Sequence, residues 1–414
     1  MLSRRSAFKA AAGIAATATM GVATGAQAAD KVVKVGMDLS LTGADSESAI
    51  RTGNGAILAF EEANKYKEVP GIMFDAVKFD DGTATAGQYD PAQAATNARK
   101  MVSDKNYIAA LGPQMSGAGK AMSPILSEGN LAIITPSSTN PDITDPKFAA
   151  QYRPKGKAIY FRTVTTDAYQ GPNMANYMAK TVGIKSVYLL DDSGAYGVGI
   201  CDSFERRCKE LGVTVMGRDR LDPKAADYSA VLTKIKSLNP DLLYYGGVGQ
   251  AGVKLAKQAY EIVPKMVKAG GDGILGTEML KGVGFPAVDG WYATNASPHK
   301  DEGDKQIKEF SDKFRARFKD SPDDYTLTMY VAARAIIETV KVLVANGKPV
   351  NRDTVRDGLQ AVRMTQSLIG PVEFDENGDL KNKVISVFKI TKDPSKPLDS
   401  IDDQYKYMGI APMS

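Results

Sequence analysis

Histidine is almost absent from this sequence. Of 414 residues only His299 is a histidine, so a Ser-His-Asp type of active site would have to be built around it. Its surroundings, Ser297 to Glu302, are polar and are typical of a solvated loop. No histidine pair at metal-binding spacing, no Gly-x-Ser-x-Gly and no P-loop motif occurs either. We therefore expect neither a catalytic site nor a metal site.

Cysteine is scarce as well, with Cys201 and Cys208 as the two examples. Both lie in the segment 198–211, whose apolar residues recur at helical spacing and which Gly212 would end. Seven residues of helix would separate their Cα atoms by about 10.5 Å, and a disulfide tolerates roughly 7 Å. We predict two small core side chains rather than a disulfide, a redox pair or a metal site.

Long apolar runs and a strong excess of one charge are also missing after residue 28. No segment there reaches the roughly 18 uninterrupted apolar residues of a membrane-spanning helix. The chain has 52 Lys and Arg against 48 Asp and Glu, and without Arg4, Arg5 and Lys9 the basic residues number 49. With no long basic block, nothing favours binding to nucleic acid or to an anionic lipid surface.

The first 28 residues have the pattern of a cleavable export signal. Arg4, Arg5 and Lys9 precede an acid-free run rich in Gly and Ala, which ends at Ala26-Gln27-Ala28. We expect cleavage near Ala28 and a periplasmic mature protein. The twin arginines suggest the Tat route for folded cargo. Ala7 stands where a bulky apolar residue is usual, however, so the Sec route stays open.

Beyond the leader, short β-rich runs alternate with helical patterns in two successive blocks. Strands are predicted at 32–39, 72–79, 108–111, 132–135, 186–190, 213–217 and 241–245. Helices are predicted at 49–65, 91–103, 117–128, 172–180, 198–211, 228–238 and 252–262. Such alternation favours βαβ units and parallel sheets. Near the end, Asn377-Gly378 predicts a hairpin turn between strands at 372–374 and 384–390.

Polar loops follow several of these strands. In open α/β sheets, ligands bind beyond the carboxyl ends of the strands. Ser116-Gly117 opens one predicted helix, and Ser137 to Thr139 follows the next strand. Hydroxyls and free N–H groups at a helix start suit a carboxylate, although each hydroxyl alone is equally typical of a cap or turn. Their concentration in neighbouring loops indicates a site for an anionic group.

A glycine motif, Gly247-Val248-Gly249-Gln250-Ala251-Gly252, stands between a predicted strand and a predicted helix. That context suits a dinucleotide-binding fingerprint. The fingerprint usually opens a fold at its first strand, whereas this motif follows a late strand of the second block, and Val263 to Lys268 is a poor next strand. A loop through which backbone approaches a small ligand is the better interpretation.

Nine short motifs run in order through nearly the whole mature chain: Leu39 to Gly43, Asn54 to Ala56, Ser116-Gly117, Thr135 to Pro141, Gln170 to Pro172, Tyr196-Gly197, Tyr244 to Gly247, Gly271 to Gly273, and Phe374 to Asp379. As an ordered set they resemble the leucine/isoleucine/valine-binding group of periplasmic solute-binding proteins, which feed ABC importers. No single motif is specific by itself.

The resemblance implies an α/β protein with the type I periplasmic binding fold: two Rossmann-like lobes with central parallel sheets and a three-crossing hinge. Lobe 1 would comprise 29–163 and 295–365, and lobe 2 would comprise 164–294 and 366–414. The crossings are expected near Arg162 to Thr166, near Tyr292 to Ala296, and near Met364 to Gly370. Such a protein would act as a monomer and deliver its ligand to an ABC permease in the inner membrane.

The resemblance also implies the ligand contacts. The α-carboxylate of an amino acid would be held by residues of the first lobe, Ser116, Ser137, Ser138 and Thr139. The α-ammonium would be met from the second lobe by Asp272 and Tyr196.

The chain departs from the leucine-binding pattern in two loops. Val248 and Gly249 stand where leucine binders have aromatics, and Ser48 stands where a large aromatic is usual. Both departures predict a larger or more polar side-chain pocket.

Our main hypothesis is therefore capture of an amino acid, branched-chain or related, by hinge closure and without a cofactor. One alternative is a binder of an aromatic or other small carboxylate for import. Another is an NAD(P)-dependent enzyme that uses Gly247 to Gly252. A ligand-sensing partner of a membrane receptor also stays open.

Overall fold

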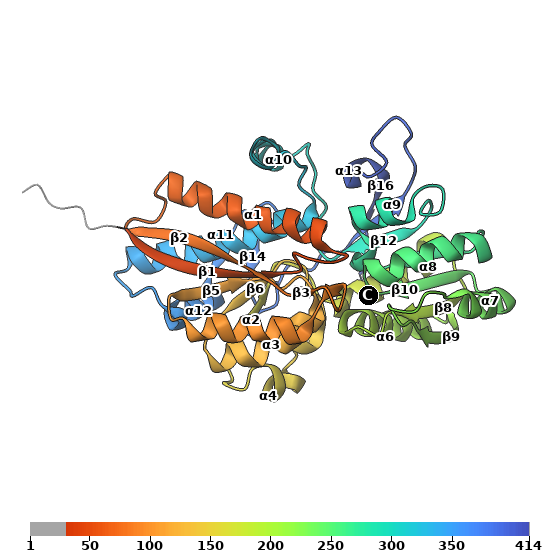
Figure 1. The fold of residues 1–414 in the computed structure, drawn as a ribbon, viewed down its shortest axis with the longest axis horizontal. Helices are drawn as coiled ribbons and strands as arrows, with labels where there is room; N and C mark the ends of the chain where they lie inside the picture. The colour runs from red at the N-terminus through yellow and green to blue at the C-terminus, as the bar shows by residue number, and fades with distance from the viewer. Residues whose placement is uncertain (1–29, 414) are drawn as a thin grey trace, which may run out of the picture.

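The computed structural model describes residues 30–413. These residues form two α/β lobes that lie side by side along the long axis of the molecule (Figure 1). The expected signal peptide, residues 1–28, falls outside the described residues. Within 30–413, no helix combines the length and the apolar character needed to cross a membrane.

The first lobe is built on a five-stranded parallel sheet with the order β2-β1-β5-β6-β7. Its strands are β1 (Lys31–Leu39), β2 (Ile72–Asp80), β5 (Tyr107–Leu111), β6 (Ile133–Thr135) and β7 (Tyr160–Arg162). All five residues of β5 are buried, as expected for a central parallel strand that helices cover on both faces.

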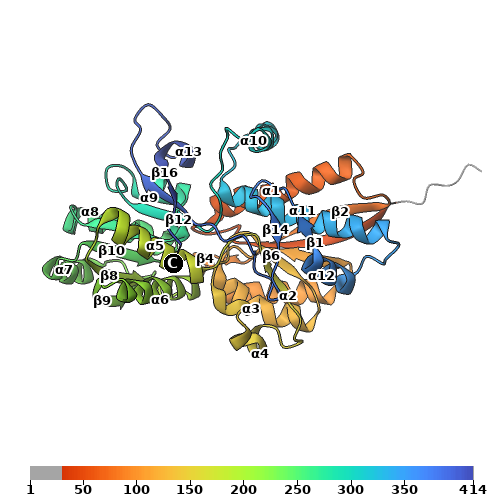
Figure 2. The same cartoon turned by 180° about the vertical axis from the view of Figure 1, so that it is seen from behind.

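The helices of the first lobe come from both ends of the chain. They are α1 (Ser46–Lys65), α2 (Pro91–Ser103), α3 (Ser116–Glu128), α4 (Ala149–Tyr152), α10 (Lys305–Phe318), α11 (Asp324–Ala345) and α12 (Arg352–Ala361). Helix α1 packs beside α11, and α2 packs beside α3 (Figures 1 and 2). The doubly wound order of the strands places these two helix pairs on opposite faces of the sheet.

The second lobe contains a seven-stranded sheet with the order β16-β15-β12-β11-β10-β8-β9. Its strands are β8 (Ser186–Asp191), β9 (Thr214–Arg220), β10 (Leu242–Gly246), β11 (Val267–Gly270), β12 (Tyr292–Asn295), β15 (Ser386–Ile390) and β16 (Tyr405–Ile410). The last two are antiparallel to their neighbours. Strand β11 forms in the segment where the sequence predicted only a poor strand.

Alternate residues of the second sheet face two separate cores. Leu243 and Tyr245 of β10 lie in the core beneath α7 (Ser229–Leu238) and α8 (Gly249–Ile262). Leu242 and Tyr244 lie in the core beneath α5 (Asp167–Tyr177) and α6 (Ala195–Glu210). Cys201 and Cys208 of α6 are buried and unpaired in that second core, which confirms the prediction of two small core side chains.

Short elements complete the lobes. They are the 3-10 turns η1 (Pro141–Ile143), η2 (Pro146–Phe148) and η4 (Asp272–Ile274), the π-helical turn η3 (Met178–Val182), the helices α9 (Thr277–Val283) and α13 (Ile401–Gln404), and the two-stranded sheets of β3 (Gly82–Thr83) with β4 (Gln88–Tyr89) and of β13 (Arg363–Met364) with β14 (Val372–Glu373).

The chain passes between the lobes three times. The first crossing joins β7 to α5, and the second follows β12 toward α10. The third was expected near Met364 to Gly370, but the chain stays with the first lobe beyond that point. Phe374 packs on Phe161 with ring centroids 5.1 Å apart, and Leu380 lies in the same core. The return to the second lobe therefore follows Leu380, and residues 366–380 belong to lobe 1 rather than to lobe 2.

The expected hairpin around Asn377-Gly378 is also wrong in part. The turn exists and closes a single bridge between Phe374 and Leu380. However, β14 pairs with β13 in the first lobe, while β15 pairs with β12 and β16 in the second. Gly378 sits so close to β7 that a β-carbon on it would lie 2.2 Å from the Tyr160 carbonyl oxygen. This approach keeps the turn in the first lobe.

Candidate functional site

A small cavity of about 60 Å³ lies between the two lobes, at the carboxyl ends of both sheets. Its walls come from the loops after β1, β5 and β6 of the first lobe and after β8, β10 and β11 of the second. The lining residues are Asp45, Ser48, Gln114, Met115, Ser116, Ser137, Tyr196, Val248, Gly249, Asp272, Gly273, Ile274, Leu275, Gly276, Glu278, Met279 and Tyr325. Six of the eight residues predicted from the sequence are among them.

Helix α3 points its N-terminus at the first-lobe wall of this cavity. Its N-cap residue is Met115, whose side chain cannot accept from the first-turn N–H groups, so these groups are available to a ligand. The Ser116 hydroxyl accepts from the Asn140 N–H at 3.2 Å, and the Ser137 hydroxyl donates to the Gln114 carbonyl at 3.0 Å. This wall therefore combines a favourable helix dipole with fixed hydroxyls, an arrangement that suits a carboxylate.

Ser138 and Thr139 were predicted to bind the same end of the ligand, but neither lines the cavity. Both are buried, and hydrogen bonds to their backbone carbonyls hold the loop in place. Arg162 donates from Nε to the Ser138 carbonyl at 2.9 Å and from Nη2 to the Asn140 carbonyl at 2.6 Å. The Thr139 carbonyl accepts from the Asp167 N–H at 2.9 Å. In the described conformation these residues shape the loop that presents Ser137.

Asp272 forms the opposite wall, at the start of η4. Its Oδ2 accepts from the Tyr325 hydroxyl, and its Oδ1 accepts from Gln170 Nε2 at 3.1 Å. The Tyr196 hydroxyl accepts from the Gly273 N–H at 3.0 Å, so it stands beside the same turn. Tyr325 is contributed by α11, and its distance from this loop in the sequence left it out of the prediction.

A second carboxylate, Asp167, lies behind Asp272. Gln170 Nε2 also donates to Asp167 Oδ1 at 2.8 Å, and Gln170 Oε1 accepts from the Thr294 hydroxyl at 2.8 Å, which fixes the orientation of the amide. Burial raises the pKa of Asp272, and burial together with the charge of Asp272 raises the pKa of Asp167. Two buried acids around one amide, with no cation of residues 30–413 bonded to either, make this wall favourable to an ammonium group.

The glycine motif lines the cavity, but carboxylates already lie at the N-terminus of the helix that it begins, α8. Val248 and Gly249 line the cavity at the N-terminus of α8. The Val248 N–H donates to Asp192 Oδ2 at 3.0 Å. A β-carbon on Gly249 would lie 3.4 Å from Asp45 Oδ1. Two carboxylates thus stand where a nucleotide fingerprint would place a pyrophosphate.

Three further polar residues of the cavity were missed in the sequence. Gln114 Nε2 donates to the Ser48 hydroxyl at 3.3 Å, and Glu278 Oε1 accepts from the Ser48 N–H at 2.9 Å. Asp45 lies beside them and is buried, and its Oδ2 accepts no hydrogen bond from the described residues. Asp45 and Gln114 stand in loops that follow strands, so the position of those loops was a usable signal. Glu278 lies inside α9 and carried no such signal.

Direct contacts between the lobes surround the cavity. The hydrogen bond from the Ser48 N–H to Glu278 is one of these contacts. On the same side, Arg51 Nη1 donates to the Thr277 hydroxyl at 3.1 Å, and Lys281 pairs with Glu47 at 2.8 Å. Asn140 Nδ2 donates to the Ala195 carbonyl at 2.8 Å. The structure therefore describes a closed arrangement of the lobes.

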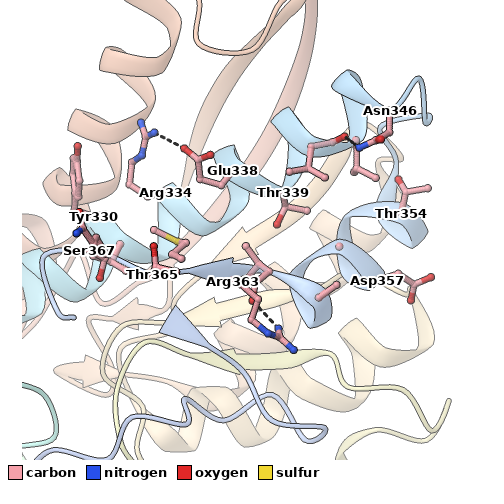
Figure 3. A pocket seen from close by; sticks show the side chains of 18 of the residues that line it. Tyr330, Arg334, Glu338, Thr339, Asn346, Thr354, Asp357, Arg363, Thr365 and Ser367 are labelled. Atoms are coloured by element: carbon pink, nitrogen blue, oxygen red, sulfur yellow. Dashed lines mark hydrogen bonds and ion pairs between the residues drawn. The ribbon is translucent and has the colours of Figure 1, made fainter. Parts of the chain in front are cut away.

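A larger groove of about 760 Å³ lies on the first lobe alone, between α11, α12 and the segment that follows α12 (Figure 3). Its Arg334 is paired with Glu338 of the same groove at 2.8 Å and with Glu68 beside it at 2.7 Å. No residue predicted for the site lies there. The cavity between the lobes is therefore the better candidate for ligand binding.

Comparisons with known proteins bear on the family and the fold. A family model described as "Periplasmic binding protein" matches residues 32–394. The Leu/Ile/Val-binding protein BraC3 of Rhizobium johnstonii is 30% identical over 359 residues, which cover 86% of this chain and 91% of that protein. The crystal structure of the leucine binding protein LivK from Thermotoga maritima is similar with a TM-score of 0.78 and 24% identity, covering 92% of this chain and 98% of that one. A solute binding protein from R. palustris, solved in complex with benzoate, gives a TM-score of 0.74 at 19% identity and covers 93% of this chain and 98% of its own.

Proposed function

This chain belongs to the periplasmic binding protein family, and on that premise we propose that it captures an amino acid as the solute-binding component of an ABC importer. Its fold is the type I periplasmic binding fold that the sequence predicted. The observation that carries the proposal is the polarity of the cavity. An open helix N-terminus with serine hydroxyls faces a buried carboxylate cluster, as the two charges of a zwitterion require.

Closure of the lobes would be driven by the ligand. The carboxylate end binds Ser116, Ser137 and the start of α3 in the first lobe, and the ammonium end binds Asp272 and Tyr196 in the second. A ligand that touches both lobes favours the closed state by its difference in affinity for the two states. The closed form would then be recognised by an inner-membrane permease. The leader at 1–28 would deliver the chain to the periplasm.

A binder of an aromatic or other small carboxylate is the second candidate. The benzoate complex of the R. palustris protein favours it, as does the absence of an aromatic at Val248, Gly249 and Ser48 of the cavity wall. Such a ligand has no ammonium group, so it would leave Asp272 without a cationic partner. The NAD(P)-dependent enzyme is disfavoured because Asp192 accepts a hydrogen bond from the Val248 N–H at the start of α8, where a pyrophosphate would bind.

The decisive test is calorimetric titration of the purified mature protein with a panel of amino acids and aromatic acids, combined with Asp272→Ala. We expect an amino acid to bind and the substitution to weaken binding by a few kcal/mol, or at least a hundredfold, because the ammonium loses its buried partner. Glu261→Ala, at an exposed carboxylate of the same lobe, should leave affinity unchanged. Unaltered affinity in Asp272→Ala would remove Asp272 from the site and support the aromatic acid instead.

A further inference from the structure

The cavity has a second acidic end, separate from Asp272. Asp45 of the first lobe and Glu278 of the second both line it. Asp45 is only 6% exposed, and its Oδ2 has no hydrogen-bond partner among the described residues. A β-carbon on Gly249 would lie 3.4 Å from Asp45 Oδ1 and 3.8 Å from Glu278 Cβ, so both acids flank the start of α8. Asp272 is bonded instead to Gln170 and Tyr325.

Within residues 30–413, no cation is bonded to Asp45 or Glu278. The lining of the cavity contains no Lys, Arg or His. Arg51 is the nearby cation that acts on Glu278, but its own guanidinium is bonded to Asp320 at 2.9 Å and to the Thr277 hydroxyl at 3.1 Å. A buried carboxylate without a cation or a full set of donors is unfavourable. A positively charged group of a ligand would relieve this arrangement.

We propose that Asp45 and Glu278 select a basic amino acid, whose side-chain ammonium or guanidinium they bind at the end of the cavity opposite its α-ammonium. The proposal rests on the proposed function, because it requires the α-carboxylate at Ser116 and the α-ammonium at Asp272. It goes beyond that function by naming the ligand class. The branched-chain amino acids of the relatives' names carry no group that could partner Asp45.

Apolar side chains of the cavity wall suit the stem of such a ligand. Met115, Val248, Ile274, Leu275 and Met279 are apolar residues of the lining. Basic side chains bury their methylene stems along apolar surface while their charged end meets polar groups. Ser48 and Gln114 add acceptor oxygens near the acidic end, since Gln114 Oε1 is buried without a hydrogen-bond donor in the described chain. A guanidinium or ammonium offers several N–H donors for these oxygens.

The test compares L-ornithine, L-lysine and L-arginine with L-leucine and L-glutamine by isothermal titration at pH 8. We expect at least one basic amino acid to bind ten times more tightly than leucine and glutamine. Asp45→Asn should reduce its affinity at least tenfold without reducing the affinity for leucine. Glu278→Gln should act in the same direction. Glu128→Gln, an exposed first-lobe carboxylate paired only with Lys155, is the matched control and should change nothing.

The outcomes separate the two proposals. If leucine or glutamine binds as tightly as every basic amino acid, or if Asp45→Asn keeps the preference for the basic ligand, the basic ligand class is overturned while amino-acid capture stands. If no amino acid binds and benzoate does, both are overturned. Circular dichroism of each variant keeps loss of folding apart from loss of binding, and retained leucine affinity in Asp45→Asn gives the same assurance.

Discussion

Asp45 and Asp272 are both buried acids of one cavity, but their surroundings differ. Asp272 accepts hydrogen bonds from Gln170 and Tyr325, which hold its two oxygens in place before a ligand arrives. Asp45 has no such donor on its Oδ2. The ionised form of Asp45 is therefore costly in the closed state unless a ligand supplies the missing positive charge.

A pH dependence follows for Asp45. Burial and the charges of Glu278 on α9, Asp192 after β8 and Asp81 after β2 raise its pKa to about 7. A raised carboxyl pKa means that closure is unhindered below the ordinary value near 4 and pays the full cost of ionisation above 7. We expect Asp45→Asn to bind leucine more tightly than the unaltered protein at pH 8, by up to about three orders of magnitude.

The measurement is the ratio of the two affinities for leucine between pH 8 and pH 5. The ratio should fall steadily as the pH drops below 7 and approach one only below about 4, because Asp45 is then protonated in the open state as well as in the closed state. Asp272 and Asp167 also have raised pKa values. Both acids are present in the unaltered protein and in Asp45→Asn, so their titration cancels in the ratio. A ratio that is constant across this range would show that Asp45 does not change its charge on closure.

The residues of the site were predictable to the extent that they follow strands. Ser137 and Val248 lie in such loops, Ser116 and Tyr196 lie in the first turn of the helix that follows, and all four line the cavity. Tyr325 and Glu278 do not follow a strand of the sheet. They reach the cavity because α11 begins at the hinge and α9 lies opposite α1, and these are tertiary placements that no local pattern in the sequence encodes.

At the scale of elements, helix α6 packs against the loop after β6, residues 136–140, through Gly199. A β-carbon on Gly199 would lie 2.7 Å from Asn140 Nδ2. The Asn140 side chain cannot easily yield, because its Nδ2 donates to the Ala195 carbonyl at 2.8 Å and its Oδ1 accepts from the Asp142 N–H at 3.1 Å. The absence of a side chain at Gly199 is therefore a requirement of closure.

Gly199→Ala should have opposite effects on folding and on binding. Alanine favours the helix by about 0.5–1 kcal/mol relative to glycine, so the melting temperature of the ligand-free protein should stay equal or rise. Ligand affinity should fall tenfold or more, because the methyl group collides with Asn140 across the cleft. Thermal unfolding and calorimetry measure the two effects. Adding Asn140→Ala should restore part of the lost affinity, and equal affinity in Gly199→Ala and the unaltered protein would contradict the argument.

Most elements were predictable because their patterns are local. The helix at 91–103 agrees with α2 at both ends, where Pro91 opens it and Asp90 accepts from the Ala92 N–H. The hairpin at 377–378 was wrong because the turn signal is local while the strand partners are not. Val372 pairs with Met364, and Val387 pairs with Thr294 in the other lobe. The third hinge crossing between them leaves no pattern in the sequence.

At the scale of the whole molecule, the hinge and the cavity are joined by α11. Its first turn holds Tyr325, which packs in the second-lobe core and donates to Asp272, while Leu327 and the rest of the helix belong to the first-lobe core. A ligand at Asp272 thus acts directly on an element that both lobes share. This connection provides a physical route from ligand binding to the relative position of the lobes.

Closure should be visible as a change of shape rather than of intrinsic tryptophan fluorescence. Trp291 is the only tryptophan, and its place near a crossing suggests a reporter. However, its side chain is fully buried in the second-lobe core. We expect small-angle X-ray scattering to show a smaller radius of gyration on saturation with the ligand, while Trp291 emission stays constant. Gly199→Ala, saturated with the same ligand, should keep the larger radius because its lobes cannot meet. A ligand-free protein that is already as compact as the complex would show that the lobes close without the ligand.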